Sequence, residues 1–236
     1  MSGVIFQSLG YASVPALAVV VGTIVAMWKV PSDAIRSGIQ HLAAGVVFCV
    51  LATELLPDLV HRRMPWVTLL GFSLGVIVLL TLKWMQPEEA LGGNARAMLT
   101  AVGIDVFVDG LLIGLSFAAG QVQSLLLTVG LTLELGFLGV AIATTLAANQ
   151  MAGTRILTVA VALGIVLCVG GGLGAWVLGV LRPSVIDGLL AFGVAALLYL
   201  VTEELLVEAH EVKDTPIQTG MFFLGFIALW TFEMLI

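Results

Sequence analysis

Long apolar runs follow one another along almost the whole chain, and they constrain its fold more than any other feature. Each run is about 20 residues or longer, which is enough for a helix to cross the hydrocarbon core of a bilayer. The connections between runs are short, so we predict a single transmembrane domain over 1–236 with no separate soluble domain. Turn-forming and charged residues separate the runs and predict eight spans, at 8–28, 37–59, 65–84, 97–119, 122–147, 155–180, 184–208 and 216–236.

Composition supports an all-α polytopic membrane protein. Apolar residues make up 60% of the 236 residues and charged residues only 10%, with a mean hydropathy of +1.16. A soluble domain is about half apolar and a quarter charged, so this chain could not cover its surface with polar groups. Its nine Lys and Arg residues are scattered, which argues against nucleic-acid binding. Cys49 and Cys168 both fall inside predicted spans and imply no disulfide framework.

The basic residues predict which way the spans run. If the N-terminus lies outside, six basic residues face the cytoplasm and three face outward: Lys29, Arg36, Lys83, Arg96, Arg155 and Lys213 against Arg62, Arg63 and Arg182. An excess on the cytoplasmic side favours this orientation, and eight spans then leave the C-terminus outside as well. Residues 1–10 lack the basic region of a signal peptide, so we expect the first span to be retained.

Two of the predicted spans resemble each other. Residues 43–56 in the second span and 191–206 in the seventh both begin with Ala-x-Gly and both contain Thr-Glu followed by Leu-Leu, with one residue of slippage. The two spans run in opposite directions in the predicted topology, as expected for an inverted repeat. We therefore predict a 3+2+3 arrangement, in which 1–84 and 155–236 are inverted repeats around the helix pair 97–147.

Two carboxylates, those of Asp105 and Asp109, lie inside the apolar fourth span. Their spacing places them on one helix face, one turn apart. A charge at bilayer depth costs at least a few kcal/mol, so the pair needs a cation, a proton or an aqueous cavity. Glu134 is equally central in the fifth span, and three such oxygen ligands suit a divalent cation held between helices. The alternative is a pair of protonated acids that hydrogen-bond to neighbouring helices.

Further acidic residues lie toward the ends of the spans. Glu54 comes near the predicted outer end of the second span, and Glu203 and Glu204 near the inner end of the seventh. We interpret them as steps on an ion path, with interfacial side chains that reach water as the alternative. Glu208 and His210 continue the seventh span to the cytoplasmic boundary, as parts of an exit path or as a solvated helix end.

A glycine run, Gly170–Gly172 followed by Gly174, lies in the sixth span. Small residues let helices approach closely in membranes, so we expect close packing here. The run is no phosphate loop, because a preceding strand and a following Lys-Ser/Thr are both missing. Glycine- and alanine-rich span faces also permit a homodimer.

At these positions the sequence resembles the ZIP (Zrt/Irt-like) family of divalent metal transporters, nearest its GufA-like bacterial branch. Residues 105–114, Asp-Val-Phe-Val-Asp-Gly-Leu-Leu-Ile-Gly, lie over the family's His-Asn-x-Pro-Glu-Gly-Leu-Ala-x-Gly. Residues 199–210 resemble its acidic Glu-Glu-x-x-Pro-Glu segment, and 54–58, Glu-Leu-Leu-Pro-Asp, resemble its acid/His-Leu-Leu-Pro-Glu end. The resemblance implies eight spans in a 3+2+3 inverted arrangement, both termini outside, and a bacterial inner membrane.

The sequence also departs from the family pattern. Asp105 stands in place of His, Val106 in place of Asn and Asp109 in place of Glu, and two registers remain open around Glu134. At most one of the family's two adjacent metal positions is therefore complete. An all-carboxylate site is less selective for zinc than imidazole or thiolate and shifts the preference toward manganese, iron(II), magnesium or cadmium. Zinc stays first only because of the resemblance.

The resemblance implies a transporter of a divalent cation, with Zn²⁺ first and Mn²⁺, Fe²⁺ or Cd²⁺ next, and no cofactor besides this ion. Asp105, Asp109 and Glu134 would hold the ion at the midplane, while spans 1, 4, 5 and 6 move against 2, 3, 7 and 8 in an elevator-type motion. The alternative is a ZIP-like metal sensor or structural membrane protein that has lost transport, which the missing His, Asn and second Glu favour.

An enzyme is not expected. An intramembrane aspartyl protease also uses two aspartates, but they must face each other across a water molecule, normally from different helices. Asp105 and Asp109 are predicted to stack on one helix, which argues against that chemistry.

Overall fold

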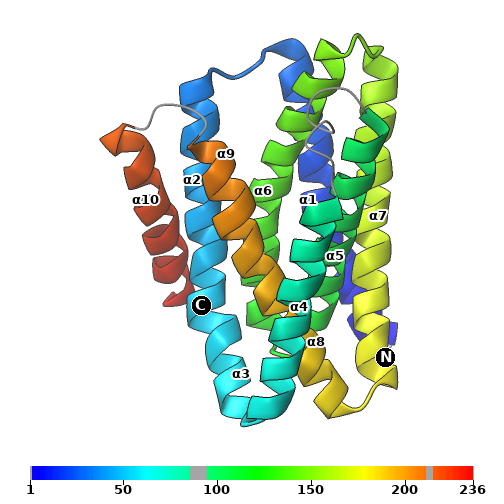
Figure 1. Ribbon diagram of the computed structural model, residues 1–236, viewed down its shortest axis with the longest axis vertical. Helices are drawn as coiled ribbons and strands as arrows, with labels where there is room; N and C mark the ends of the chain where they lie inside the picture. The colour runs from blue at the N-terminus through cyan, green and yellow to red at the C-terminus, as the bar shows by residue number, and fades with distance from the viewer. Residues whose placement is uncertain (1, 86–94, 211–214, 236) are drawn as a thin grey trace.

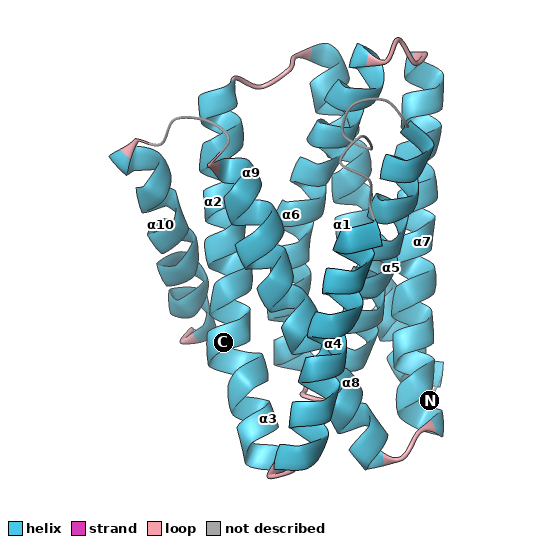
Figure 2. Cartoon of the chain, in the orientation of Figure 1, coloured by secondary structure: helices cyan, strands magenta, loops and turns pink. Residues whose placement is uncertain are grey.

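The structure, a computed structural model, describes residues 2–85, 95–210 and 215–235, and within these ranges it consists of helices joined by short turns (Figure 2). Lys213 and the last residue of the predicted span 216–236 lie outside the described residues. The helices are α1 (Ser2–Trp28), α2 (Asp33–Val50), η1 (Leu51–Leu55), α3 (Leu56–Arg62), α4 (Pro65–Met85), α5 (Ala95–Ser116), α6 (Gln121–Ala148), α7 (Gly153–Val180), α8 (Pro183–Tyr199), η3 (Leu200–Leu205), α9 (Leu206–Ala209) and α10 (Pro216–Glu233).

Seven helical segments in the described part of the chain are long and apolar enough to cross a membrane. The prediction of an all-α membrane protein is thereby confirmed. The 18-residue helix α10 falls outside these seven, because Gln218 and Glu233 lower its mean hydropathy. The seven are Ser2–Trp28, Asp33–Arg62, Pro65–Trp84, Met98–Ser116, Gln121–Ala148, Gly153–Val180 and Pro183–Ala209.

Helix boundaries differ most from the predicted ones at the first, second, fourth and eighth spans, and in the eighth α10 ends at Glu233. α1 begins at Ser2 rather than residue 8, and α2 begins at Asp33 rather than residue 37. α5 ends at Ser116 rather than residue 119, because the chain turns back toward α6. The Gly120 amide donates to the Ser116 carbonyl, and Gly120 has a φ of 143°, which favours glycine at this position.

The helices form two bundles that pack against each other. In the first, which we call the site bundle, α1 packs along α6 and α7, and α5 packs along α7. In the second, the flanking bundle, α2 packs along α10 and α4 along α8, with the short α3 and α9 attached. The bundles meet where α2 lies along α6 and where α5 contacts α8.

The site bundle is held together by close contacts at glycine. A Cβ on Gly110 of α5 would lie 2.2 Å from the Leu167 carbonyl oxygen of α7. A Cβ on Gly174 of α7 would lie 2.4 Å from the carbonyl oxygen of Leu111. Only glycine leaves room for such contacts, so the predicted close packing of the glycine-rich sixth span is confirmed.

A similar contact fixes α6 against α1. A Cβ on Gly139 would lie 2.2 Å from the Val19 carbonyl oxygen, and the Thr23 hydroxyl donates to the Gly139 carbonyl at 3.1 Å. Together the two sets of contacts orient α5 and α6, the helices that carry the central carboxylates.

Among the described residues, two spans contain a π-helical segment, η1 in the second and η3 in the seventh. Both segments contain acidic residues, one in η1 (Glu54) and two in η3 (Glu203 and Glu204). π-Helical turns often occur at functional sites. Because α2 and α8 run in opposite directions, the two segments lie toward opposite ends of the molecule (Figure 1).

We name the ends of the molecule by the chain that meets there. The N-terminal end, at the bottom of Figure 1, carries the start of α1 and the turns α3–α4, α5–α6 and α7–α8. The opposite end carries the turns α1–α2 and α6–α7 and the end of α9.

Candidate functional site

Asp105, Asp109 and Glu134 bring one carboxylate oxygen each to within 4.8 Å of one another. The two aspartates lie one turn apart on α5, as their spacing predicts, and Glu134 comes from α6. All three residues belong to the site bundle. The predicted convergence of these side chains is therefore present in the fold.

Two of the three carboxylates are nearly inaccessible. Asp109 is 3% exposed and Glu134 is 4% exposed. Within the described residues, Asp109 Oδ2 and Glu134 Oε2 have no hydrogen-bond partner. Burying an ionised group without a partner is costly. A divalent cation would neutralise two of these charges and accept carboxylate oxygens as ligands.

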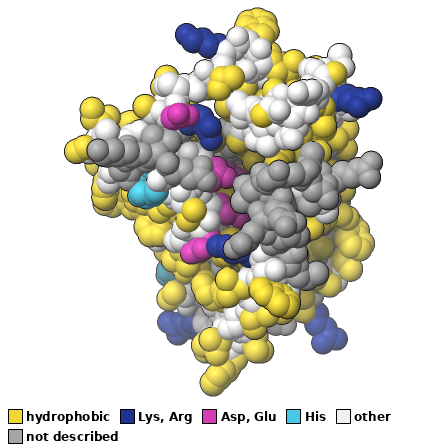
Figure 3. All heavy atoms as spheres, turned by 45° about the horizontal axis from the view of Figure 1, so that its top comes forward, with side chains coloured by type: hydrophobic (Ala, Val, Ile, Leu, Met, Phe, Trp, Pro, Cys, Tyr) yellow, Lys and Arg dark blue, Asp and Glu magenta, His cyan; other side chains and the backbone are white. Residues whose placement is uncertain are grey.

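Glu204 and Glu208 extend the carboxylate cluster toward the opposite end, and we call these two residues the carboxylate row. Glu204 on η3 lies close enough to Asp109 and Glu134 for Coulomb repulsion. Glu208 on α9 lies equally within Coulomb repulsion of Asp105 and Glu134. Figure 3, with the opposite end turned forward, shows Asp and Glu side chains gathered in a band on this face. Acidic side chains lining one approach attract cations toward it.

Polar side chains of α2 contact this row of carboxylates where α9 ends. Gln40 Nε2 donates to Glu208 Oε2 at 2.6 Å, and Ser37 Oγ donates to the Ala209 carbonyl at 2.9 Å. The ring centroids of His41 and His210 lie 5.1 Å apart. The predicted exit residue His210 thus lies beside a second imidazole, a ligand type that suits transition metals.

Glu203 and Glu54 are not brought into the carboxylate cluster. The Glu203 side chain is 45% exposed, and its carboxylate pairs with Lys83 at 2.7 Å. Neighbouring residues on a helix do not share a face, so Glu203 and Glu204 point in different directions. Glu54 is 9% exposed and lies toward the N-terminal end, where its Oε2 accepts a hydrogen bond from Gln123 Nε2 at 2.5 Å.

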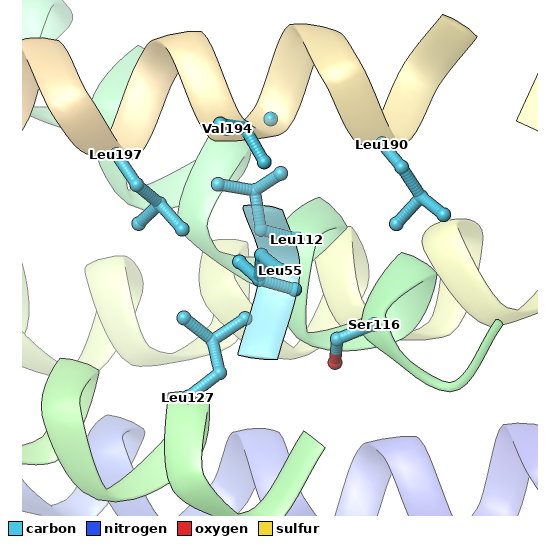
Figure 4. Close-up of a pocket in the computed structure, with 8 residues that line it drawn as sticks. Leu55, Leu112, Ser116, Leu127, Leu190, Val194 and Leu197 are labelled. Atoms are coloured by element: carbon cyan, nitrogen blue, oxygen red, sulfur yellow. The ribbon is translucent and has the colours of Figure 1, made fainter. Parts of the chain in front are cut away.

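Apolar side chains fill the bundle interface between the carboxylates and the N-terminal end. Leu112 lies three residues beyond Asp109 on α5, and a Cβ on Gly193 of α8 would lie 2.2 Å from Leu112 Cδ2. Leu112 therefore occupies the space that Gly193 leaves. Around it, a small cavity is lined by Leu55, Leu112, Ser116, Leu127, Leu190, Gly193, Val194 and Leu197 (Figure 4). We call these residues the leucine interface.

Sequence reasoning missed an ion network at the N-terminal end. Arg62, predicted to lie in a loop, is the last residue of α3 and donates from Nε to Asp58 Oδ2 at 2.7 Å and from Nη1 to Asp187 Oδ1 at 2.6 Å. Its Nη2 donates to the Ala118 carbonyl at 2.7 Å. The four-residue spacing of Asp58 and Arg62 was a detectable helical pair, whereas Asp187 and Ala118 join the network only through the fold.

No protein-family model and no curated protein matches this sequence. The site therefore has to be interpreted from its own geometry. That geometry combines a buried carboxylate cluster, a row of further carboxylates toward the opposite end, and an apolar interface toward the N-terminal end.

Proposed function

We propose that the protein transports a divalent metal cation and holds it between Asp105, Asp109 and Glu134. The observation that carries this proposal is the convergence of three carboxylate oxygens within 4.8 Å, two of them from residues that are at least nine-tenths buried. Hard oxygen ligands of this kind suit a divalent cation. The two aspartates stack on one helix, which supports a transporter over an aspartyl protease.

Zinc is the substrate we propose first, followed by manganese, iron(II) and cadmium. The preference for zinc derives from the resemblance of residues 105–114, 199–210 and 54–58 to the ZIP family. The central ligands are all carboxylates, which favours the other three ions more than an imidazole site would. Metal competition therefore has to rank the four.

We further propose eight spans in the 3+2+3 inverted arrangement, with α10 as the eighth. The proposed symmetry exchanges spans 1–3 with spans 6–8, and span 4 with span 5. Under this exchange the α1–α6 pair corresponds to the α7–α5 pair. The α2–α10 pair likewise corresponds to the α8–α4 pair. All four pairs pack extensively, which supports the symmetry. The π-helical segments η1 and η3 occupy matching positions in the second and seventh spans.

In the proposed mechanism the site bundle carries the ion past the flanking bundle. Asp105, Asp109 and Glu134 all move with the site bundle, whereas Glu204 and Glu208 stay with the flanking bundle. The spans expected to move together, 1, 4, 5 and 6, are the helices α1, α5, α6 and α7 that pack on one another. We assign the protein to a bacterial inner membrane with both termini outside, so that the acid-lined end faces the cytoplasm.

Uptake into liposomes tests the proposal. The purified protein is reconstituted, and the appearance of Zn²⁺, Mn²⁺, Fe²⁺ and Cd²⁺ is followed with a trapped dye. Saturable uptake should be lost in Asp105→Asn and Asp109→Asn and retained in the control Glu203→Gln, whose side chain points away from the cluster. Metal binding without flux for any ion would favour the sensor or structural alternative. Absence of both binding and flux would end the metal proposal.

A further inference from the structure

In the part of the chain that the structure describes, two side-chain hydrogen bonds cross the bundle interface toward the N-terminal end. Arg62 of the flanking bundle donates to the Ala118 carbonyl of the site bundle at 2.7 Å. Gln123 of the site bundle donates to Glu54 of the flanking bundle at 2.5 Å. Both lie on the side of the leucine interface that is remote from the carboxylate row.

Two ion pairs within the flanking bundle orient the Arg62 side chain toward the site bundle. Its two carboxylate partners, Asp58 on α3 and Asp187 on α8, belong to its own bundle, and the three side chains are 22%, 25% and 7% exposed. Such paired, charge-assisted hydrogen bonds orient the guanidinium. Its remaining arm points at Ala118, two residues beyond the end of α5, where the helix dipole places partial negative charge.

We propose that Arg62, together with the Glu54–Gln123 contact, is a latch that keeps the N-terminal end of the bundle interface closed. Relative motion of the bundles breaks the bond from Arg62 to Ala118 but leaves both ion pairs intact. Opening therefore leaves the Arg62 charge paired, and the guanidinium stays oriented for closure. The latch covers the leucine interface and must open before the carboxylates can be reached from this end.

The proposal rests on the proposed transport function, which supplies the reason for the interface to open. The latch itself is tested without metal. Ser116 lines the leucine interface and is 1% exposed. Ser116→Cys is placed in a Cys49→Ala, Cys168→Ala background and reconstituted in lipid nanodiscs. Its rate of alkylation by a charged, water-soluble maleimide is measured by mass spectrometry.

Alkylation should be slow with the latch intact and about tenfold faster with Arg62→Gln, the change expected for losing one hydrogen bond to a charged group. Gln123→Ala should raise the rate as well. The matched control is Arg63→Gln, which removes the neighbouring exposed arginine and should leave the rate unchanged.

Equal rates in Arg62→Gln, Arg63→Gln and the parent overturn the latch. If Arg62→Gln does not fold, Gln123→Ala and Arg62→Lys decide, and an unchanged rate in both overturns it equally. Faster alkylation in a protein that shows no metal flux keeps the latch and removes the transport proposal. Metal uptake with an unchanged alkylation rate supports the transport proposal and overturns the latch.

Discussion

At the scale of residues, Asp109 and Glu134 are buried in a way that packing alone does not explain. Each leaves a carboxylate oxygen without a hydrogen-bond partner within the described residues, and like charges lie on both α5 and η3. Replacing buried charges by neutral groups of similar shape often stabilises a protein. The cost of these carboxylates is consistent with a site that is completed by a cation.

We therefore expect Asp109→Asn and Glu134→Gln to raise the free energy of unfolding without metal by about 1 kcal/mol or more. The parent protein should gain further thermal stability when zinc or manganese is added, by mass action, and both variants should lose that gain. Thermal unfolding in detergent measures each effect, with Glu203→Gln as the control. A destabilised metal-free variant, or a parent that no divalent ion stabilises, contradicts the expectation.

Protons compete with the metal for the same carboxylate oxygens. Metal binding requires deprotonated ligands, so the affinity should fall as the pH is lowered, and binding should release protons into a weakly buffered solution. Calorimetric titration at several pH values, in buffers of different ionisation enthalpy, measures both. An affinity that does not change with pH would mean that the ion binds away from these carboxylates.

At the scale of elements, glycine contacts decide how α5 lies on α7. Gly110 follows Asp109 directly, and its position allows the Leu167 carbonyl of α7 to approach. The same helix carries Gly103, where an added Cβ would meet nothing within 4 Å. The helix α5 thus carries one glycine packed against α7 and one whose added Cβ would have no close neighbour, and the two can be compared by the same substitution.

Gly110→Ala should destabilise the protein by about 1–3 kcal/mol, as overpacking does, and should weaken metal binding because α5 must move away from α7. Gly103→Ala should be neutral or stabilising by up to about 1 kcal/mol, the helix preference for alanine. Thermal unfolding and metal titration of the two variants make the comparison. Equal effects would show that the close α5–α7 contact does not hold the site.

At the scale of the whole molecule, the carboxylates of the central cluster lie on the site bundle. Glu204 and Glu208, which form the carboxylate row, lie on the flanking bundle. The interface between the bundles is acidic toward the opposite end and apolar at the leucine interface, and the contacts of Arg62 and Gln123 lie beyond it at the N-terminal end. Leu112 and Gly193 meet across the apolar part. A bond between these two positions would prevent relative motion.

A cysteine pair, Leu112→Cys with Gly193→Cys in the background without native cysteines, should stop metal uptake when it is cross-linked by Hg²⁺ or oxidation. Metal binding should persist, because the central ligands lie on one bundle, and reduction should restore uptake. Each single cysteine under the same treatment is the control. Full cross-linking with undiminished uptake would exclude motion between the bundles.

Properties that depend on neighbours along one helix followed from the sequence. Backbone groups in lipid must be satisfied within the segment, so long apolar runs predict helices, and the spacing of Asp105 and Asp109 predicts a shared face. The glycines of the sixth span likewise predicted close packing. Helix ends were less predictable, because the turn at Ala118–Gly120 depends on local backbone hydrogen bonds.

Properties that depend on how helices are rotated and paired were decided by the tertiary structure. The position of Glu134 beside the aspartates depends on α6 lying on α1 through Gly139, and the bond from Arg62 to Asp187 joins residues 125 positions apart. Glu203 and Glu204 are neighbours in sequence, yet only Glu204 lies beside the central carboxylates. Apolar surface drives each span into the membrane regardless of its partners, whereas the direction of a polar side chain is set by the one packing in which the backbones fit.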